Sequence, residues 1–126
     1  MRTASTSLPP EPASARACRR FLVATLEAWG ADQFADEAVL LLSELVTNAV
    51  VHAGTEIQVV IALDGDVLRV EVRDDNPRIP KVKHFSVLSG TGRGLALVAG
   101  TAQQWDVERL PDGGKKVWFE LHSTSG

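Results

Sequence analysis

The chain has 126 residues and a mass of 13.6 kDa, which suits a single domain, and its 44% hydrophobic and 23% charged residues are ordinary globular values. Thirteen Lys and Arg against sixteen Asp and Glu give a net charge of −3, which disfavours direct nucleic-acid binding and anionic membranes, since both need a concentrated positive field. The single cysteine, Cys18, excludes an internal disulfide and a cysteine-based zinc cage, and no run approaches the roughly 20 apolar residues of a bilayer span. Composition therefore predicts a small, soluble, cytoplasmic domain.

The N-terminal part of the chain combines a polar segment with two helical patterns. Residues 1–13 are rich in Ser, Thr, Ala and Pro, which predicts a flexible arm before a single domain over residues 14–126. Apolar residues then recur at helical spacing, which predicts helices over about 14–29 and about 36–53. Each pattern is followed by a glycine, a common residue just beyond a helix end.

The middle of the chain changes to the period of a strand. Apolar residues alternate over 57–63 and again over 68–72, and Asp64-Gly65 between them is a strong hairpin signal. Residues 75–92 contain two prolines and two glycines, so this segment is predicted to be a loop.

The last part of the chain is predicted to add one short helix, over about 93–103, and a second hairpin made of residues 104–109 and 116–122. Hairpin-linked strands and helices with one apolar stripe indicate an α+β fold. We expect a two-layer sandwich, in which about three helices cover one face of a mixed, mainly antiparallel sheet.

Polar residues interrupt the apolar pattern of the second predicted helix. Glu44, Asn48 and His52 are spaced four residues apart, which on an α-helix places them within about 80° of one another. A solvated stripe on an amphipathic helix would give the same pattern. A carboxylate can also accept a proton from a hydroxyl nucleophile, however, and an amide oxygen can ligate Mg²⁺. The stripe therefore suits a site for a metal-bound nucleotide.

A second polar motif, Asp74-Asp75-Asn76-Pro77-Arg78, follows the second predicted strand directly. A carboxylate at the end of an apolar strand can point into a pocket and accept a hydrogen bond from an exocyclic amine. An ordinary Asp-Asn-Pro turn is the alternative interpretation.

A third motif, Gly90-Thr91-Gly92-Arg93-Gly94, enters the short predicted helix. Bare backbone N–H groups and a helix N-terminus favour a phosphate at such a place. The spacing matches neither a dinucleotide fingerprint nor a Walker loop, so this motif is weak when taken alone.

Taken in this order, the three motifs closely resemble the N, G1 and G2 boxes of the GHKL (Bergerat-fold) ATPase superfamily. The segment from Leu42 to Val50, with His52, is similar to the anti-sigma-factor serine kinases and their stand-alone, histidine-kinase-like relatives. The resemblance extends over about residues 13–121. It implies a Bergerat fold that binds ATP and Mg²⁺.

The resemblance also implies roles for single residues. Glu44 would be the general base and Asn48 the Mg²⁺ ligand. Asp74 would recognise adenine by accepting a hydrogen bond from its amine. His52 would either approach the phosphates or simply end the helix. In the G2 box, Gly92 and Gly94 would let the helix N-terminus contact the phosphates. Arg93 would lie close to the phosphates or to the partner protein, and Leu95 would belong to the pocket wall or to the core.

The G1 box departs from the family pattern Asp-x-Gly-x-Gly, because neither glycine is present. The loop is expected to be stiffer, which puts tight nucleotide binding in question. Asn tolerates a positive φ, so Asn76 is expected to replace one glycine in part.

The resemblance implies an Mg·ATP-dependent protein serine/threonine kinase that is also an anti-sigma factor. Its partners would be a small anti-sigma-factor antagonist with a serine acceptor and a sigma factor, and it could form a homodimer. The chain has three histidines and none in the first predicted helix, so a histidine-kinase phosphoacceptor helix is not expected. The alternative is a catalytically inactive regulator of the same fold, either nucleotide-gated or nucleotide-free.

Overall fold

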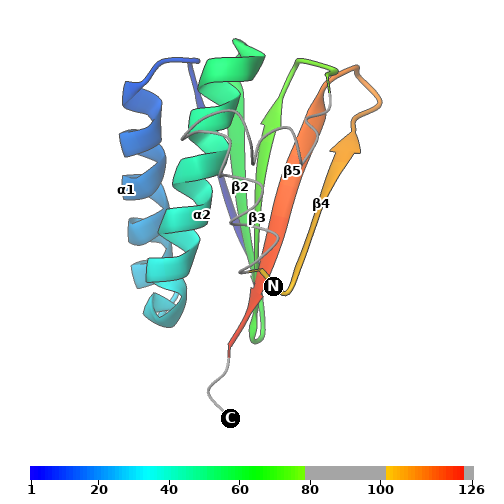
Figure 1. The fold of residues 1–126 in the computed structure, drawn as a ribbon. Helices are drawn as coiled ribbons and strands as arrows, with labels where there is room; N and C mark the ends of the chain where they lie inside the picture. The colour runs from blue at the N-terminus through cyan, green and yellow to red at the C-terminus, as the bar shows by residue number, and fades with distance from the viewer. Residues whose placement is uncertain (79–101, 124–126) are drawn as a thin grey trace.

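The computed structural model describes residues 1–78 and 102–123 (Figure 1). Two α-helices and five strands account for most of these residues, with a 3₁₀ turn before the second helix and a π-helical turn after it. In chain order the elements are β1 (Arg2–Leu8), α1 (Ala13–Ala28), η1 (Asp32–Phe34), α2 (Ala35–Asn48), η2 (Ala49–Ala53), β2 (Ile57–Asp64), β3 (Val67–Asp74), β4 (Gln104–Arg109) and β5 (Lys115–His122).

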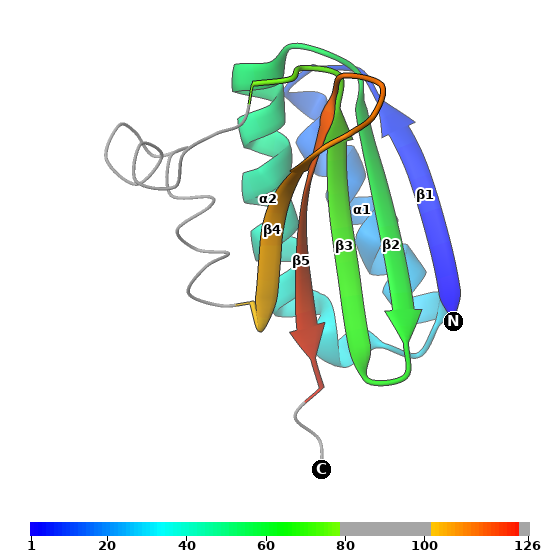
Figure 2. The ribbon, with the colours of Figure 1, turned by 90° about the vertical axis from the view of Figure 1, so that its right-hand side faces the viewer.

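The five strands form one sheet in the order β1-β2-β3-β5-β4, and every neighbouring pair is antiparallel. Figure 2 shows the sheet nearly face-on with both helices behind it, so the helices cover a single face. The predicted α+β sandwich is confirmed, and the described strands are antiparallel throughout rather than mixed. Residues 93–101 of the third predicted helix lie outside the described residues.

The core lies between the helices and the inner face of the sheet. One row across the sheet pairs Ile61 with Val70 and Val70 with Phe119, and all three are fully buried. From the helices, Leu22 and Leu42 are equally buried. Each such side chain contributes about 1.5–3 kcal/mol when it is removed from water. Neither helix has a side-chain N-cap hydrogen bond, so this core is the main force that holds the helical layer.

The N-terminal segment is the first correction. Residues 1–13 were expected to form a flexible arm, but Arg2–Leu8 form β1, which pairs with β2 along its whole length. Ser and Thr gave this segment the composition of a linker, although Ala4, Thr6 and Leu8 alternate with exposed residues and are partly buried. The backbone of β2 offers a row of hydrogen-bonding groups at this edge, and that long-range pairing cannot be read from local composition.

The second helix gives another correction. It was expected to continue to residue 53, but the α-helix ends at Asn48, and residues Ala49–Ala53 form a π-helical turn. Gly54 closes this turn with φ at 67°, and its N–H donates to the carbonyl of Ala49, five residues back. Single π turns occur often at functional sites, and this one directly follows the predicted Mg²⁺ ligand.

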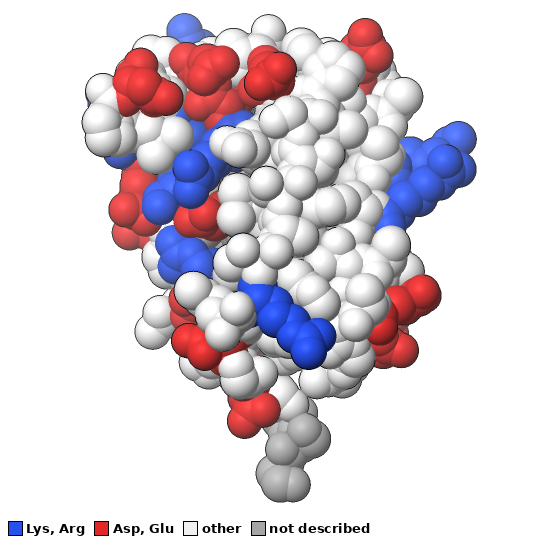
Figure 3. All heavy atoms as spheres, turned by 180° about the vertical axis from the view of Figure 1, so that it is seen from behind, with Lys and Arg blue, Asp and Glu red and all other residues white. Residues whose placement is uncertain are grey.

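The outer face of the sheet carries paired charges around Glu71. Arg73, Lys116 and Arg69 contact its carboxylate at 3.1, 3.2 and 3.2 Å, and the Arg69 guanidinium stacks on Trp118 at 3.9 Å. Burial alone would raise the pKa of Glu71, but hydrogen bonds from Arg73 and Lys116 and the Lys116 charge outweigh it, with help from Arg69, so the pKa is lowered. Figure 3 shows acidic and basic groups interleaved on the side where the sheet lies, next to a broad uncharged area.

Candidate nucleotide site

The G1 loop after β3 is hydrogen-bonded to the segment that directly follows the first motif, at the end of the π-helical turn. The N–H of Asp75 donates to Thr55 Oγ1 at 2.9 Å, and Asn76 Nδ2 donates to the carbonyl of Ala53 at 3.3 Å. These bonds tie the loop after β3 to the segment that follows the second helix. The predicted N and G1 boxes are therefore neighbours in space, although about 25 residues separate them in the sequence.

Asn48 has the most unusual environment in this region. It is 8% exposed, and neither Oδ1 nor Nδ2 has a hydrogen-bond partner among the described residues. Buried side-chain amides nearly always have partners, because leaving one unpaired costs about 1–3 kcal/mol. Glu44, one turn earlier on α2, is partly buried. A carboxylate and an unpaired amide thus lie on adjacent turns of one helix.

These two residues fit a magnesium–nucleotide complex. Mg²⁺ prefers oxygen ligands and usually keeps several waters, taking only one or two protein ligands in addition to substrate phosphates. A single amide oxygen such as Asn48 Oδ1 meets that requirement. No group of three or more His, Cys, Asp and Glu side chains that could hold a metal occurs within residues 1–78 and 102–123, so an all-protein metal cage is not supported there.

His52 differs from its predicted position. The spacing argument assumed a continuous α-helix, but His52 lies in the π-helical turn and is exposed. A π turn contains more residues than an α turn, so the regular four-residue stripe applies to Glu44 and Asn48 and does not extend to His52.

The G1 loop achieves its shape without a glycine. The N–H of Asn76 donates to Asp74 Oδ1 at 2.9 Å, and the N–H of Arg78 donates to Asn76 Oδ1 at 2.9 Å, which makes two successive side-chain turns. The expectation that Asn76 replaces a glycine through a positive φ is wrong, because no described non-glycine residue has one. Side-chain hydrogen bonds shape this loop in place of a left-handed backbone.

Sequence reasoning missed one charged residue of this site, Lys115. Its Nζ lies 2.9 Å from Asp74 Oδ1 and 3.0 Å from the carbonyl oxygen of Asn76, and Lys115 is only 7% exposed. A signal was present in the sequence, because Lys115 is in phase with Val117 and Phe119, which face the core. The predicted strand began one residue too late to include it.

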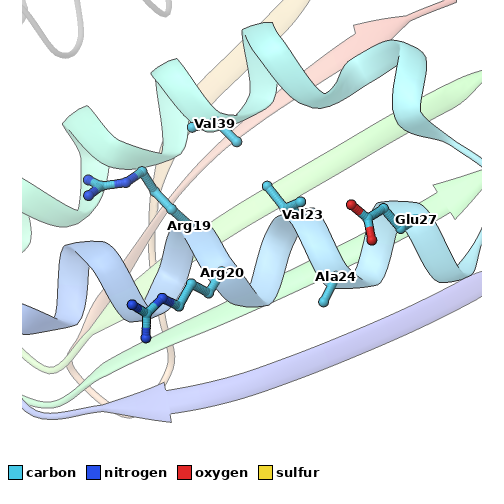
Figure 4. A pocket seen from close by; sticks show the side chains of 6 residues that line it. All are labelled: Arg19, Arg20, Val23, Ala24, Glu27 and Val39. Carbon is cyan, nitrogen blue, oxygen red and sulfur yellow. The ribbon is translucent and has the colours of Figure 1, made fainter.

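The remaining predicted residues, Gly92, Arg93, Gly94 and Leu95, lie outside the described residues, and the described part of the site consists of the N and G1 boxes. A separate open groove lies on the helical layer and is lined by none of the predicted site residues (Figure 4). Its lining residues are Arg19, Arg20, Val23, Ala24, Glu27 and Val39.

No described helix is long and apolar enough to cross a membrane.

Comparison with known protein families gives one match. Residues 8–121 match the family of the histidine kinase-like ATPase domain. No curated protein matches the chain. The match covers most of the chain, including the helix with Glu44 and Asn48, the G1 loop and β5, and it agrees with the sheet and helices described above. The chain belongs to the histidine kinase-like ATPase domain family of the GHKL superfamily, whose fold implies that it binds ATP, typically with Mg²⁺.

Proposed function

We propose that this protein is an Mg·ATP-dependent protein serine/threonine kinase that phosphorylates a small anti-sigma-factor antagonist and regulates a sigma factor by partner switching. The observation that carries the proposal is the buried, unpaired amide of Asn48, one helical turn after the partly buried carboxylate of Glu44. A helix that served only as packing would have an apolar residue at position 48, because the unpaired amide weakens the fold.

The proposed reaction moves one phosphoryl group. The serine oxygen of the antagonist forms a bond to the γ-phosphorus of ATP while the bond from that phosphorus to the bridging oxygen of ADP breaks. Glu44 accepts the serine proton, a role that typically contributes about 10²- to 10⁴-fold in rate. Asn48 Oδ1 would hold the Mg²⁺ that neutralises the phosphate charge, and Asp74 would accept a hydrogen bond from the adenine amine.

A transfer assay with a catalytic variant tests this function. Glu44→Ala is expected to retain ATP binding and to lose transfer of radiolabelled phosphate from ATP to a panel of small anti-sigma-factor antagonists. Glu37→Ala is the matched control, because Glu37 lies in the first turn of the same helix and is exposed, so it should not affect transfer. Normal phosphoprotein formation by the Glu44 variant would refute the general-base role.

The second candidate is a catalytically inactive regulator that binds its partner in a nucleotide-gated or nucleotide-free manner. The G1 loop favours it, because both family glycines are absent. A titration with Mg·ATP and the partner, read together with the transfer assay, separates the two functions. An antagonist or sigma factor that binds without becoming phosphorylated, in the presence of Mg·ATP, supports the inactive regulator.

A further inference from the structure

Asp74 and Lys115 form a buried ion pair at the point where β3 and β5 lie in register. Their side chains are 5% and 8% exposed, and Lys115 Nζ lies 2.9 Å from Asp74 Oδ1. Lysine is rarely buried, because removing an ammonium from water costs several kcal/mol unless it is paired and hydrogen-bonded. Lys115 meets that condition through Asp74 and through the carbonyl oxygen of Asn76.

Gly114 makes this arrangement possible. A Cβ atom at position 114 would overlap the carbonyl oxygen of Asp74 and crowd the Asp75 Cα at 3.1 Å. The start of β5 can therefore approach the G1 loop only because residue 114 is a glycine. The glycine that this close backbone approach requires is therefore Gly114, directly before β5, and the next residue, Lys115, carries the buried ammonium.

The hydrogen bonds leave one side of the Asp74 carboxylate available. Both Lys115 Nζ and the N–H of Asn76 donate to Oδ1. No hydrogen bond within residues 1–78 and 102–123 ends on Oδ2. Two donors on Oδ1 orient the carboxylate, and no described group competes with a ligand amine for Oδ2.

We propose that Lys115, placed by Gly114, is the positioning residue of the base site: it holds Asp74 so that Oδ2 selects a nucleotide with a 6-amino purine. This inference rests on the proposed function, which requires that the site binds ATP. Lys115 acts on the base through Asp74, and its bond to the carbonyl oxygen of Asn76 satisfies a second hydrogen of the buried ammonium. Its removal should affect base selectivity in particular, because Asn48, the proposed Mg²⁺ ligand, belongs to another element, α2.

The experiment compares binding of Mg·ATP and Mg·ITP by calorimetry, since inosine carries a 6-oxo group in place of the amine. Lys115→Met is expected to weaken ATP binding about tenfold and to leave ITP binding nearly unchanged, so that the selectivity falls. Lys116→Met is the matched control. Lys116 is the adjacent lysine, and it pairs with Glu71 on the outer face at 3.2 Å, so its loss should leave the selectivity intact.

A double variant keeps the proposal testable if Lys115→Met does not fold. Asp74→Asn/Lys115→Met removes both charges of the buried pair, a change that proteins usually tolerate better than the loss of one. If Lys115 acts only through Asp74, the double variant binds ATP as weakly as Asp74→Asn alone. Further weakening in the double variant would mean that Lys115 affects ATP binding by a route other than Asp74, and it would overturn the positioning role.

The outcomes separate this inference from the proposed function. If the wild-type protein fails to bind Mg·ATP at millimolar concentration, both the positioning role of Lys115 and the proposed function are refuted. If the wild type binds ATP selectively and Lys115→Met binds it with the same affinity and selectivity, the positioning role is refuted and the proposed function stands. A parallel loss for ATP and ITP would assign Lys115 a purely structural role.

Discussion

Replacing Asn48 by leucine should make the protein more stable and abolish its Mg²⁺-dependent binding of ATP. Asn48 is 8% exposed and both polar atoms of its amide lack partners among the described residues. Leucine has a similar size and no polar group to leave unpaired, and it suits a helix better than asparagine. It also lacks the oxygen that would ligate Mg²⁺. Stability and function are therefore expected to change in opposite directions.

The size of the effect follows from the unpaired amide. Leaving a buried polar group without a partner costs about 1–3 kcal/mol, and we expect Asn48→Leu to recover a similar amount. An unfolding entropy of about 2.1 cal/mol/K per residue gives about 0.26 kcal/mol/K for the 126 residues. The melting temperature should then rise by about 4–11 °C.

Thermal unfolding and calorimetric titration with Mg·ATP measure the two effects. Ser43→Ala is the matched control, because Ser43 lies on the same helix and its buried Oγ also lacks a partner in the described structure. The control should be more stable by about 1 kcal/mol and should bind ATP normally.

Two results would refute the reasoning. A melting temperature of Asn48→Leu at or below that of the wild type would show that the amide is satisfied in the folded protein. Mg²⁺-dependent ATP binding that survives the substitution would exclude Asn48 as the metal ligand.

Three further predictions concern single groups. Asp74→Asn should weaken ATP binding by about 10- to 150-fold and leave GTP binding almost unaffected; calorimetry that finds ATP affinity unchanged would exclude Asp74 as the base reader. The pKa of Glu71 is lower in the folded protein than in the unfolded chain, where it is about 4.3. Its ion pairs therefore stabilise the fold fully above that pH, and this stabilisation is lost as the pH falls through the pKa of Glu71 in the folded protein. Denaturant midpoints should thus drop more steeply in acid for the wild type than for Glu71→Gln, and parallel curves would contradict this. Burial raises the pKa of Cys18 to about 11, so iodoacetamide at pH 8 should alkylate it only in denaturant; rapid alkylation of the native protein would show that the thiol is accessible.

Local patterns predicted most of the sheet and the helices correctly. The Asp64-Gly65 turn and the alternation on either side place β2 and β3 within two residues of their bounds, because a hairpin is a local structure. The helical periodicity likewise placed α1 to within one residue at each end. The same patterns failed at β1, whose pairing partners lie 49 to 61 residues away in the sequence.

The candidate site also has some features that local sequence patterns predicted and others that they did not. Glu44, Asn48 and Asp74 could be chosen from the sequence, because a polar residue inside an apolar helix and a carboxylate at the end of a strand are both visible in a one-dimensional pattern. The shape of the G1 loop could not be chosen in this way. Its turns depend on which side-chain oxygen accepts which N–H, and the expected positive φ at Asn76 was wrong.

By itself, the sequence determined the superfamily, the order of the boxes and the residue types that the chemistry requires. Only the tertiary structure decided that the amide of Asn48 is buried without a partner and that Lys115 reaches Asp74 from another strand. The physical reason is that burial and ion pairing depend on the register between β3 and β5, which joins residues 41 positions apart. Such a contact leaves no periodic signal in either segment, because each strand alternates in the same way whichever partner lies beside it.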